Sequence, residues 1–155
     1  MRLDHLPRHI TGFFDHPKEC RYLEGAAFKR ACHAVAHIHR GTAANFDFDV
    51  VGKNYFCSTL ATPAGQIVAL CNCVYPYGAF ANSGAGGAGE EPVFTTASSL
   101  RASFAAHAGF ECLASHWLES AVDRAVLRDL ASVEMRQIGH WKPRRIGGII
   151  FNRWD

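Results

Sequence analysis

Two histidines spaced four residues apart are the first feature of this sequence that could do chemistry. His33 and His37 lie in a stretch that favours a helix, so both imidazole rings would share one helix face. Zinc sites use such pairs with further ligands, here Cys20 or His16, but Ala34 stands where the HExxH motif has its glutamate base. We therefore expect a histidine-rich, partly exposed helix, and a metal-binding protein or metal-dependent enzyme using His33 and His37 is the alternative.

The chain also has six cysteines, at positions 20, 32, 57, 71, 73 and 112. Cys71 and Cys73 would point to the same face of a strand, and the register of a hairpin decides whether Cys57 joins them. A three-residue loop would place Cys57 opposite Cys71, whereas a four-residue loop would turn it to the other face. No CxxC pair is present, and free cysteine is among the most buried residue types. We expect reduced thiols in the core.

Other possible catalytic groups are incomplete. Cys112 and His116 stand four residues apart, but a third group to orient the histidine is not evident. The glycine-rich segment Asn82–Gly89 lacks the lysine of a phosphate-binding loop, and Glu90 and Glu91 follow it and would repel a phosphate. The sequence therefore predicts a loop there, and a protein that is not an enzyme and uses no metal or cofactor.

Length and composition bound the class of protein. The chain has 155 residues, of which 48% are hydrophobic and 19% charged, as in a globular protein. We expect one domain over residues 1–155. The apolar runs are too short to span a bilayer, and the polar, proline-broken first residues lack the apolar region of a secretory signal. The expected location is the cytoplasm.

Charge is distributed unevenly along the chain. The formal net charge is +2 with neutral histidines, too small to suggest binding to nucleic acid or a membrane. Residues 90–134 hold seven acids and three bases, whereas residues 136–153 hold five bases and no acid. The aromatic side chains within residues 75–80 have no basic neighbour between Lys53 and Arg101, which argues against base stacking.

The first half of the sequence predicts one helix followed by strands. Apolar residues spaced by three and four favour an amphipathic helix over about 18–40. Residues 46–50 alternate as a half-buried strand does, and residues 54–61 and 67–75 are apolar runs joined by a proline–glycine turn. We expect the two runs to form an antiparallel hairpin that ends at Pro76.

The second half predicts helices. Thr95 or Thr96 would cap the first helix, and a second helix would cover residues 111–118. Residues 122–138 would form a longer amphipathic helix, and a short helix would lie within 144–155. The expected fold class is α+β. It has a small antiparallel sheet, made of the hairpin and one or more further strands, packed with several helices, and its C-terminal half is helical.

The C-terminal residues carry a resemblance to a known group of proteins. They read Trp141-Lys142-Pro143, then Ile146-Gly147, then Ile149-Ile150-Phe151-Asn152-Arg153-Trp154-Asp155. This tail resembles small bacterial proteins that end in a WKP…G…IFNxWD pattern and are associated with toxin-immunity loci, including immunity proteins of contact-dependent growth inhibition systems. The match covers roughly the last 22 residues. The tryptophans and the asparagine of the tail are expected to support the fold.

The resemblance implies a cytosolic inhibitor without catalysis of its own. Such a protein binds the C-terminal toxin domain of a large secreted effector, and many of these toxins are nucleases, including RNases. Immunity proteins against nucleases often present an acidic surface, whereas this chain is acidic only over residues 90–134. The expected partner is a cognate toxin domain, with no direct contact to nucleic acid or a membrane. The expected partner-binding residues are Glu90, Glu91, Glu111, Glu119 and Asp123, with Tyr77 as an aromatic anchor.

Overall fold

The computed structural model describes residues 1–82, 87–107 and 109–154. The strands are β1 (Thr42–Asp47), β2 (Tyr55–Thr62), β3 (Gly65–Asn72), β4 (Tyr77–Ala81) and β5 (Glu111–Cys112). The α-helices are α1 (Gly25–Ile38), α2 (Ser98–Ala105), α3 (Ser115–Leu118), α4 (Ser132–Trp141) and α5 (Gly147–Ile150). Two 3₁₀ turns, η1 (Pro17–Glu19) and η2 (Arg124–Leu127), complete the described elements. Among the described residues no helix is both long and apolar enough to cross a membrane.

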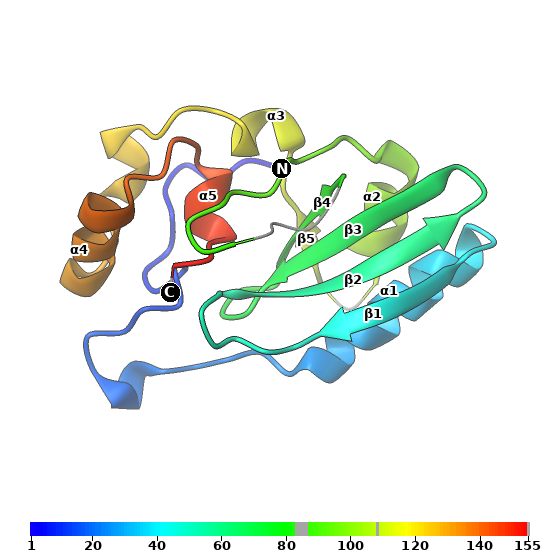
Figure 1. Ribbon diagram of the computed structural model, residues 1–155, viewed down its shortest axis with the longest axis horizontal. Coiled ribbons are helices and arrows are strands. Elements are labelled where there is room, and N and C mark those ends of the chain that lie inside the picture. Colours follow the sequence, from blue (N-terminus) through cyan, green and yellow to red (C-terminus); the bar gives the residue numbers. More distant parts are fainter. Residues whose placement is uncertain (83–86, 108, 155) are drawn as a thin grey trace.

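The five strands form one small sheet in the order β1-β2-β3-β4-β5 (Figure 1). Neighbouring strands are antiparallel except for β4 and β5, which are parallel because the chain returns to the same edge of the sheet after passing through α2. The expected α+β class with a small sheet is thus confirmed. The sheet is mixed, however, because of the short parallel strand at its edge.

The β2–β3 hairpin settles the placement of the cysteines. Thr62 pairs with Gly65, so the loop has only two residues, and Gly65 takes a φ of 125° that favours glycine. In this register Cys57 lies opposite Leu70 and not opposite Cys71. Cys57 therefore points to the other face of the sheet.

Strand β4 was missed by the sequence analysis, which ended the strand region at Pro76. The strand starts directly after that proline and contains glycine and two alanines, so it lacks the β-branched residues that mark most strands. It nevertheless lies inside the sheet, and its Phe80 is buried. Here the neighbouring strands override a weak local preference.

The expected strand over residues 46–50 is wrong in its position. Strand β1 ends at Asp47 after an irregularity that begins at Ala44, and Asn45 has a φ of 55°. Two successive side-chain turns then end the strand, because Asp47 Oδ1 accepts from the N–H of Asp49, and Asp49 Oδ1 accepts from the N–H of Val51, both at 2.9 Å.

Helix α1 starts seven residues later than expected, because Cys20 and Glu24 have extended backbone and the N–H of Leu23 between them donates to Cys73 O at 2.7 Å. Neither threonine caps α2, whose N-cap is Ala97. Thr96 instead shares a hydrogen bond of 2.7 Å with the Ser115 hydroxyl, which joins the start of α2 to α3.

The long helix expected over residues 122–138 is wrong, because η2 and α4 are separate elements. The Asp123 carboxylate caps η2 by accepting from the N–H of Ala125 at 3.0 Å. The Glu134 carboxylate reaches back to the N–H of Ala131 at 2.8 Å and marks the start of α4. The segment 111–118 is likewise divided, into strand β5 and helix α3.

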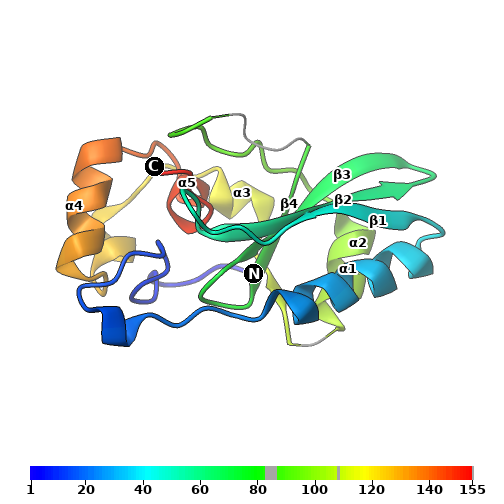
Figure 2. The same cartoon turned by 60° about the horizontal axis from the view of Figure 1, so that its bottom comes forward.

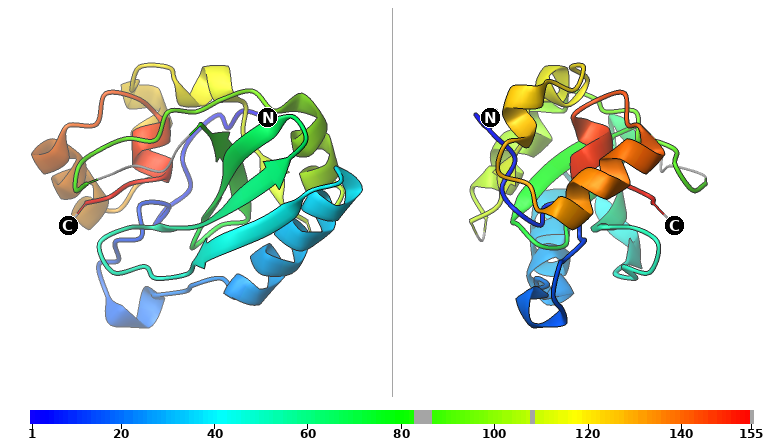
Figure 3. Two further views of the ribbon diagram at one scale, coloured as in Figure 1. Left: turned by 45° about the vertical axis from the view of Figure 1, so that its right-hand side comes forward. Right: turned by 90° about the vertical axis from the view of Figure 1, so that its left-hand side faces the viewer.

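The sheet separates two hydrophobic clusters. Helices α1 and α2 cover one face, where Phe28, Phe56 and Phe104 are buried together (Figure 2). On the other face α5 and the N-terminal segment gather at one end of the sheet, away from the tip of the β2–β3 hairpin (Figures 1 and 3). Leu6 and Ile150 are fully buried there. The two ends of the chain therefore build the same part of the molecule.

Candidate partner-binding surface

Three buried asparagines fasten the N-terminal segment to α5 and the sheet. The side-chain nitrogens of Asn54 and Asn72 each donate to Ile10 O and Ile150 O, at distances of 2.7 to 2.9 Å. The N–H of Asn152 donates to Asn54 Oδ1 at 2.7 Å, and Asn152 Nδ2 donates to Thr11 O at 3.0 Å. Because these groups are all buried, every one of these bonds satisfies an atom that water does not reach.

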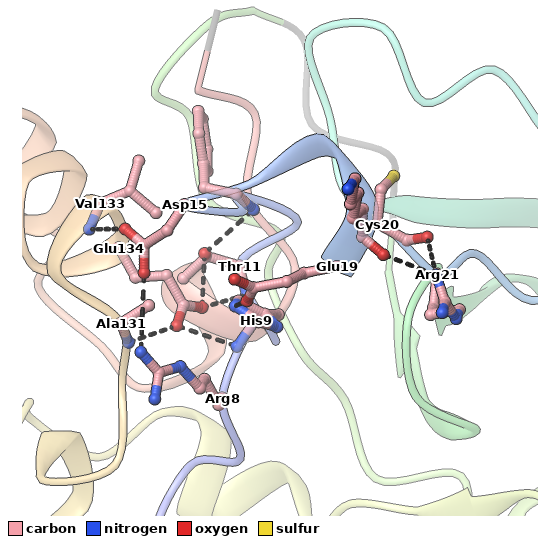
Figure 4. A network of polar contacts seen from close by, with 12 residues as sticks. Arg8, His9, Thr11, Asp15, Glu19, Cys20, Arg21, Ala131, Val133 and Glu134 are labelled. Carbon is pink, nitrogen blue, oxygen red and sulfur yellow. Dashed lines mark hydrogen bonds and ion pairs between the residues drawn. The ribbon is translucent and has the colours of Figure 1, made fainter.

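A buried carboxylate completes this network (Figure 4). Glu134 has no exposed surface. Its two oxygens accept from the N–H of His9 at 2.9 Å, the N–H and the hydroxyl of Thr11 at 3.2 and 2.7 Å, and the N–H of Ala131. One carboxylate thus ties the N-terminal segment to the first turn of α4. It is saturated by four donors and serves the fold.

A cavity of about 230 Å³ opens above the network. Thr11, Asn54 and Asn152 contribute to its lining, and its further lining residues include Phe13, Tyr22, Val50, Gly52 and Trp154. We call Thr11, Asn54 and Asn152 the floor of the cavity, and their hydrogen bonds to one another already hold them in place. We call this cavity the central pocket.

Lys53 also lines the central pocket, but its ammonium group is occupied. Lys53 Nζ donates to the carbonyl oxygens of Asp49 and of Tyr55, the latter at 3.0 Å, and forms an ion pair with Asp47 at 3.3 Å. These contacts engage its donors, and only 4% of the side chain is exposed. The ammonium group is thus already paired within the protein.

Four apolar residues line the central pocket or adjoin its lining in sequence, and two of them are well exposed. Tyr22 is 50% exposed and Val51, which lies between the lining residues Val50 and Gly52, is 83% exposed. Phe14 supports Tyr22 through an edge contact of 5.9 Å between ring centroids. We call Phe13, Tyr22, Val50 and Val51 the apolar rim. Exposed apolar surface around a pocket is typical of a protein–protein contact, in which a partner side chain fills the pocket.

Two of the predicted interface acids are engaged within the protein. Glu91 and Glu119 both bind the guanidinium of Arg145, and the Arg145 Nε to Glu91 Oε2 distance is 2.8 Å. Glu119 Oε1 also accepts from the N–H of Phe94 at 3.0 Å. Burial alone would lower the pKa of Arg145, but its hydrogen bonds to Glu91 and Glu119 raise that pKa above its ordinary value. This cluster of Glu91, Glu119 and Arg145 links residues 91–94 to the end of α3 and to the segment before α5.

The other predicted interface residues lie in separate local contacts. Tyr77 and Glu111 are neighbours in the β4–β5 register, and Tyr77 stacks on Tyr75 with ring centroids 5.7 Å apart. Burial raises the pKa of Tyr77, and the charge of Glu111 adds to this effect. Asp123 caps η2, and Glu90 Oε2 accepts from the N–H of Gly87 at 3.1 Å. Their part in partner binding stays a prediction.

Among the described residues, no third ligand lies close to the histidine pair. The His33 ring packs on Phe46 with ring centroids 5.0 Å apart, and both His33 and His37 are exposed on α1. Within the part of the chain that the structure describes, no three His, Cys, Asp or Glu side chains gather closely enough to hold a metal ion.

The cysteines are free, and burial dominates their chemistry. It raises the pKa of Cys73 to about 12 and that of Cys112 to about 11. It also raises the pKa values of Cys32, Cys57 and Cys71. The expected pair of Cys112 with His116 on one helix is wrong, because Cys112 belongs to β5 and His116 to α3.

We predict a corresponding pattern of thiol reactivity. The thiolate is the reactive form, so buried thiols with raised pKa values react slowly near pH 8. The half-buried Cys20 should react first with a disulfide reagent in the native protein, Cys57 more slowly, and the other four only after unfolding. Mass spectrometry of labelled peptides reports the order. Rapid native labelling of Cys71 or Cys73 would contradict the packing described here.

The sequence analysis missed the apolar rim because it assigned the rim residues to different segments: Phe13 and Val51 to connections, Val50 to the end of a strand and Tyr22 to a helix. The one available signal was the placement of the bulky residues Phe13, Phe14 and Val51 outside the predicted strands and helices. Comparisons of the chain with protein-family models, with curated proteins and with solved structures found no match.

Proposed function

We propose that this protein is an immunity protein, which binds a cognate toxin domain and neutralises it by covering its functional surface. The observation that carries the proposal is the apolar rim around the central pocket. Val51 exposes 83% of its surface and Tyr22 exposes 50%. Leaving such side chains in water contributes nothing to folding, whereas covering them with a partner would contribute to binding.

The construction of the pocket also suits tight binding. Asn54 and Asn152 hold its floor through buried hydrogen bonds, so little conformational freedom remains to be lost when a partner side chain enters. A preorganised pocket next to an exposed tyrosine is the usual arrangement of residues that dominate binding energy.

The tail that carries the resemblance to immunity proteins supports this same pocket. Phe151 is fully buried against Tyr55 and Phe94, with ring centroids 6.2 and 5.7 Å apart. Asn152 and Trp154 then line the central pocket. The tail pattern and the exposed rim therefore meet at one place, as one binding site would require.

The proposal predicts which surface substitutions abolish binding. The test is to co-express the tagged protein with the polypeptide encoded immediately upstream, and to measure co-purification, affinity and rescue of growth. Val51→Asp should weaken binding at least about tenfold, because it places a charge in an apolar contact. Rescue of growth should weaken with it.

A matched control is Val93→Asp, which makes the same change at a valine that is 54% exposed. Neither Val93 nor its neighbours in sequence line the central pocket, whereas both neighbours of Val51 do. The Val93→Asp variant should bind as the wild type does. Equal effects of the two substitutions would refute the placement of the interface. Failure of the wild type to co-purify or to rescue growth would refute the proposed function.

A further inference from the structure

A second hollow adjoins the central pocket, and Trp154 lines both. This groove has a volume of about 630 Å³ and runs between Gly89 and Glu91 on one side and residues 141–145 on the other. It is partly open to solvent, so it could accept a segment of another molecule. We call it the tail groove.

The tail groove carries uncompensated positive charge. Its cations are Lys142, Arg144 and Arg145, and the carboxylates of Glu91 and Glu119 pair with the last of these. Three cations and two carboxylates leave a net charge of +1, and the unpaired cations are Lys142 and Arg144. The side chains of Lys142 and Arg144 are exposed and form no hydrogen bond or ion pair with any residue that the structure describes.

The adjoining surface of α4 extends this charge. Its exposed residues include Arg136 and His140 and no acid, because the acid of this helix, Glu134, is buried. His140 touches the Trp141 ring edge-on, with ring centroids 5.3 Å apart, so the helix surface continues into the groove. The exposed cations Arg136, Lys142 and Arg144 can attract anionic groups to this surface.

The walls of the groove are held in place. The backbone of Gly89, at a φ of 77°, lies against the Trp141 ring so closely that an added Cβ would be 3.1 Å from it. The N–H of Gly89 donates to Arg153 O at 2.6 Å, and the N–H of Arg144 donates to Glu91 Oε1 at 3.0 Å. The backbone that carries the charged side chains is therefore held in position.

We propose that the tail groove binds an acidic, extended segment of the protein partner, with carboxylates on Lys142 and Arg144 and a neighbouring apolar side chain in the central pocket. The identity of that partner rests on the proposed function. Arg144 presents a planar guanidinium, which binds a carboxylate through two parallel hydrogen bonds. The apolar rim of the adjoining central pocket would accept an apolar side chain of the same segment.

A nucleic acid fits the same surface less well. A polynucleotide needs a row of cations along its phosphates, and here Glu91 stands in the groove wall beside two uncompensated cations. The whole chain has a formal net charge of only +2. The charge is thus local, as a short acidic segment requires.

The direct test uses small probes and needs no toxin domain. Isotope-labelled protein is titrated with a short polyglutamate peptide that ends in leucine, and separately with a single-stranded oligothymidylate of equal formal charge. The peptide should shift the amide and indole resonances of Trp141, Lys142 and Arg144, and the effect should fade as salt is added. Absence of these shifts, or tighter binding of the oligothymidylate, would overturn the proposal.

The second test uses variants and the partner. Lys142→Asn removes a charge and suits the left-handed backbone at φ 50°, and Arg144→Gln removes the other. The double variant should lower the association rate with the toxin domain about tenfold at low salt and lose the peptide-induced shifts. Arg30→Gln, at an exposed position of α1, is the matched control and should change neither.

The peptide titration and the toxin-binding measurement can refute the groove site and the proposed function separately. Peptide shifts in the groove without any binding of the toxin domain would keep the acidic-segment site and refute the proposed function. Toxin binding that the double variant leaves unchanged would keep the function and refute the role of the tail groove.

Discussion

Replacement of Glu134 by alanine is expected to lower the free energy of unfolding by about 4 kcal/mol, the largest loss that we predict for a single side chain. The carboxylate is fully buried and accepts four hydrogen bonds, from His9, Thr11 and Ala131. Its removal leaves these donors unsatisfied in a place that water reaches poorly. A typical domain has only about 5–15 kcal/mol of stability, so the variant would be close to unfolding.

Urea unfolding at neutral pH measures this loss. Met135→Ala is the control, because the methionine is the next residue of α4 and is 42% exposed, so its loss should cost under about 1 kcal/mol. Glu134→Gln keeps the shape but replaces one accepting oxygen by a donor that faces other donors, and it should fall between the two. A loss from Glu134→Ala no larger than that from Met135→Ala would mean that the buried carboxylate is not a structural link.

The second large effect is expected at the floor of the central pocket. Asn54→Asp exchanges one nitrogen for an oxygen, and that nitrogen donates to Ile10 O and Ile150 O at 2.9 Å. A carboxylate there would face two carbonyl oxygens without donating to either. We expect a loss of about 3 kcal/mol or more at neutral pH, together with loss of partner binding through the pocket.

This loss should depend on pH in a defined direction. Burial and the two carbonyl oxygens disfavour the charged form, so the introduced carboxyl has a higher pKa in the folded state than the value of about 4 in the unfolded chain. Below about pH 4 it is neutral in both states, and the deficit relative to wild type is smallest. The deficit grows as the pH rises above that value and levels off above the folded-state pKa.

Denaturant unfolding of the variant and the wild type across this pH range tests the prediction. Asn82→Asp makes the same change at an exposed asparagine and should give a small, nearly constant difference. A deficit in Asn54→Asp that shrinks as the pH rises would contradict the described hydrogen bonds.

Local patterns were sufficient to predict the hairpin, the first helix and the fold class, because apolar periodicity reports which face of an element is buried. They failed where contacts distant in sequence decide the structure. Strand β4 forms because β3 lies beside it, although its glycine and alanines favour no strand. The break between η2 and α4 depends on the Glu134 carboxylate, whose other partners lie more than a hundred residues away.

The prediction of an acidic interface was limited for the same reason, because it depends on contacts between residues distant in sequence. Composition identified the acids of residues 90–134, but it could not show that Glu91 and Glu119 meet at Arg145. The unpaired cations are found instead at Lys142 and Arg144, within and directly after the Trp141-Lys142-Pro143 part of the tail, and the sequence analysis gave these two residues no role. Which charges stay unpaired depends on the tertiary structure, because pairing joins residues far apart in the chain.

The joining of the two chain ends also determines when the protein can act during its synthesis. The floor of the central pocket contains a hydrogen bond between residues 141 positions apart, from Asn152 to Thr11. A nascent chain whose residues 149–154 are still inside the ribosome can pair β1 to β4, but it has no pocket floor. High contact order of this kind slows folding. Any binding at the central pocket would therefore begin only after residues 149–154 have left the ribosome and Asn152 has met Thr11.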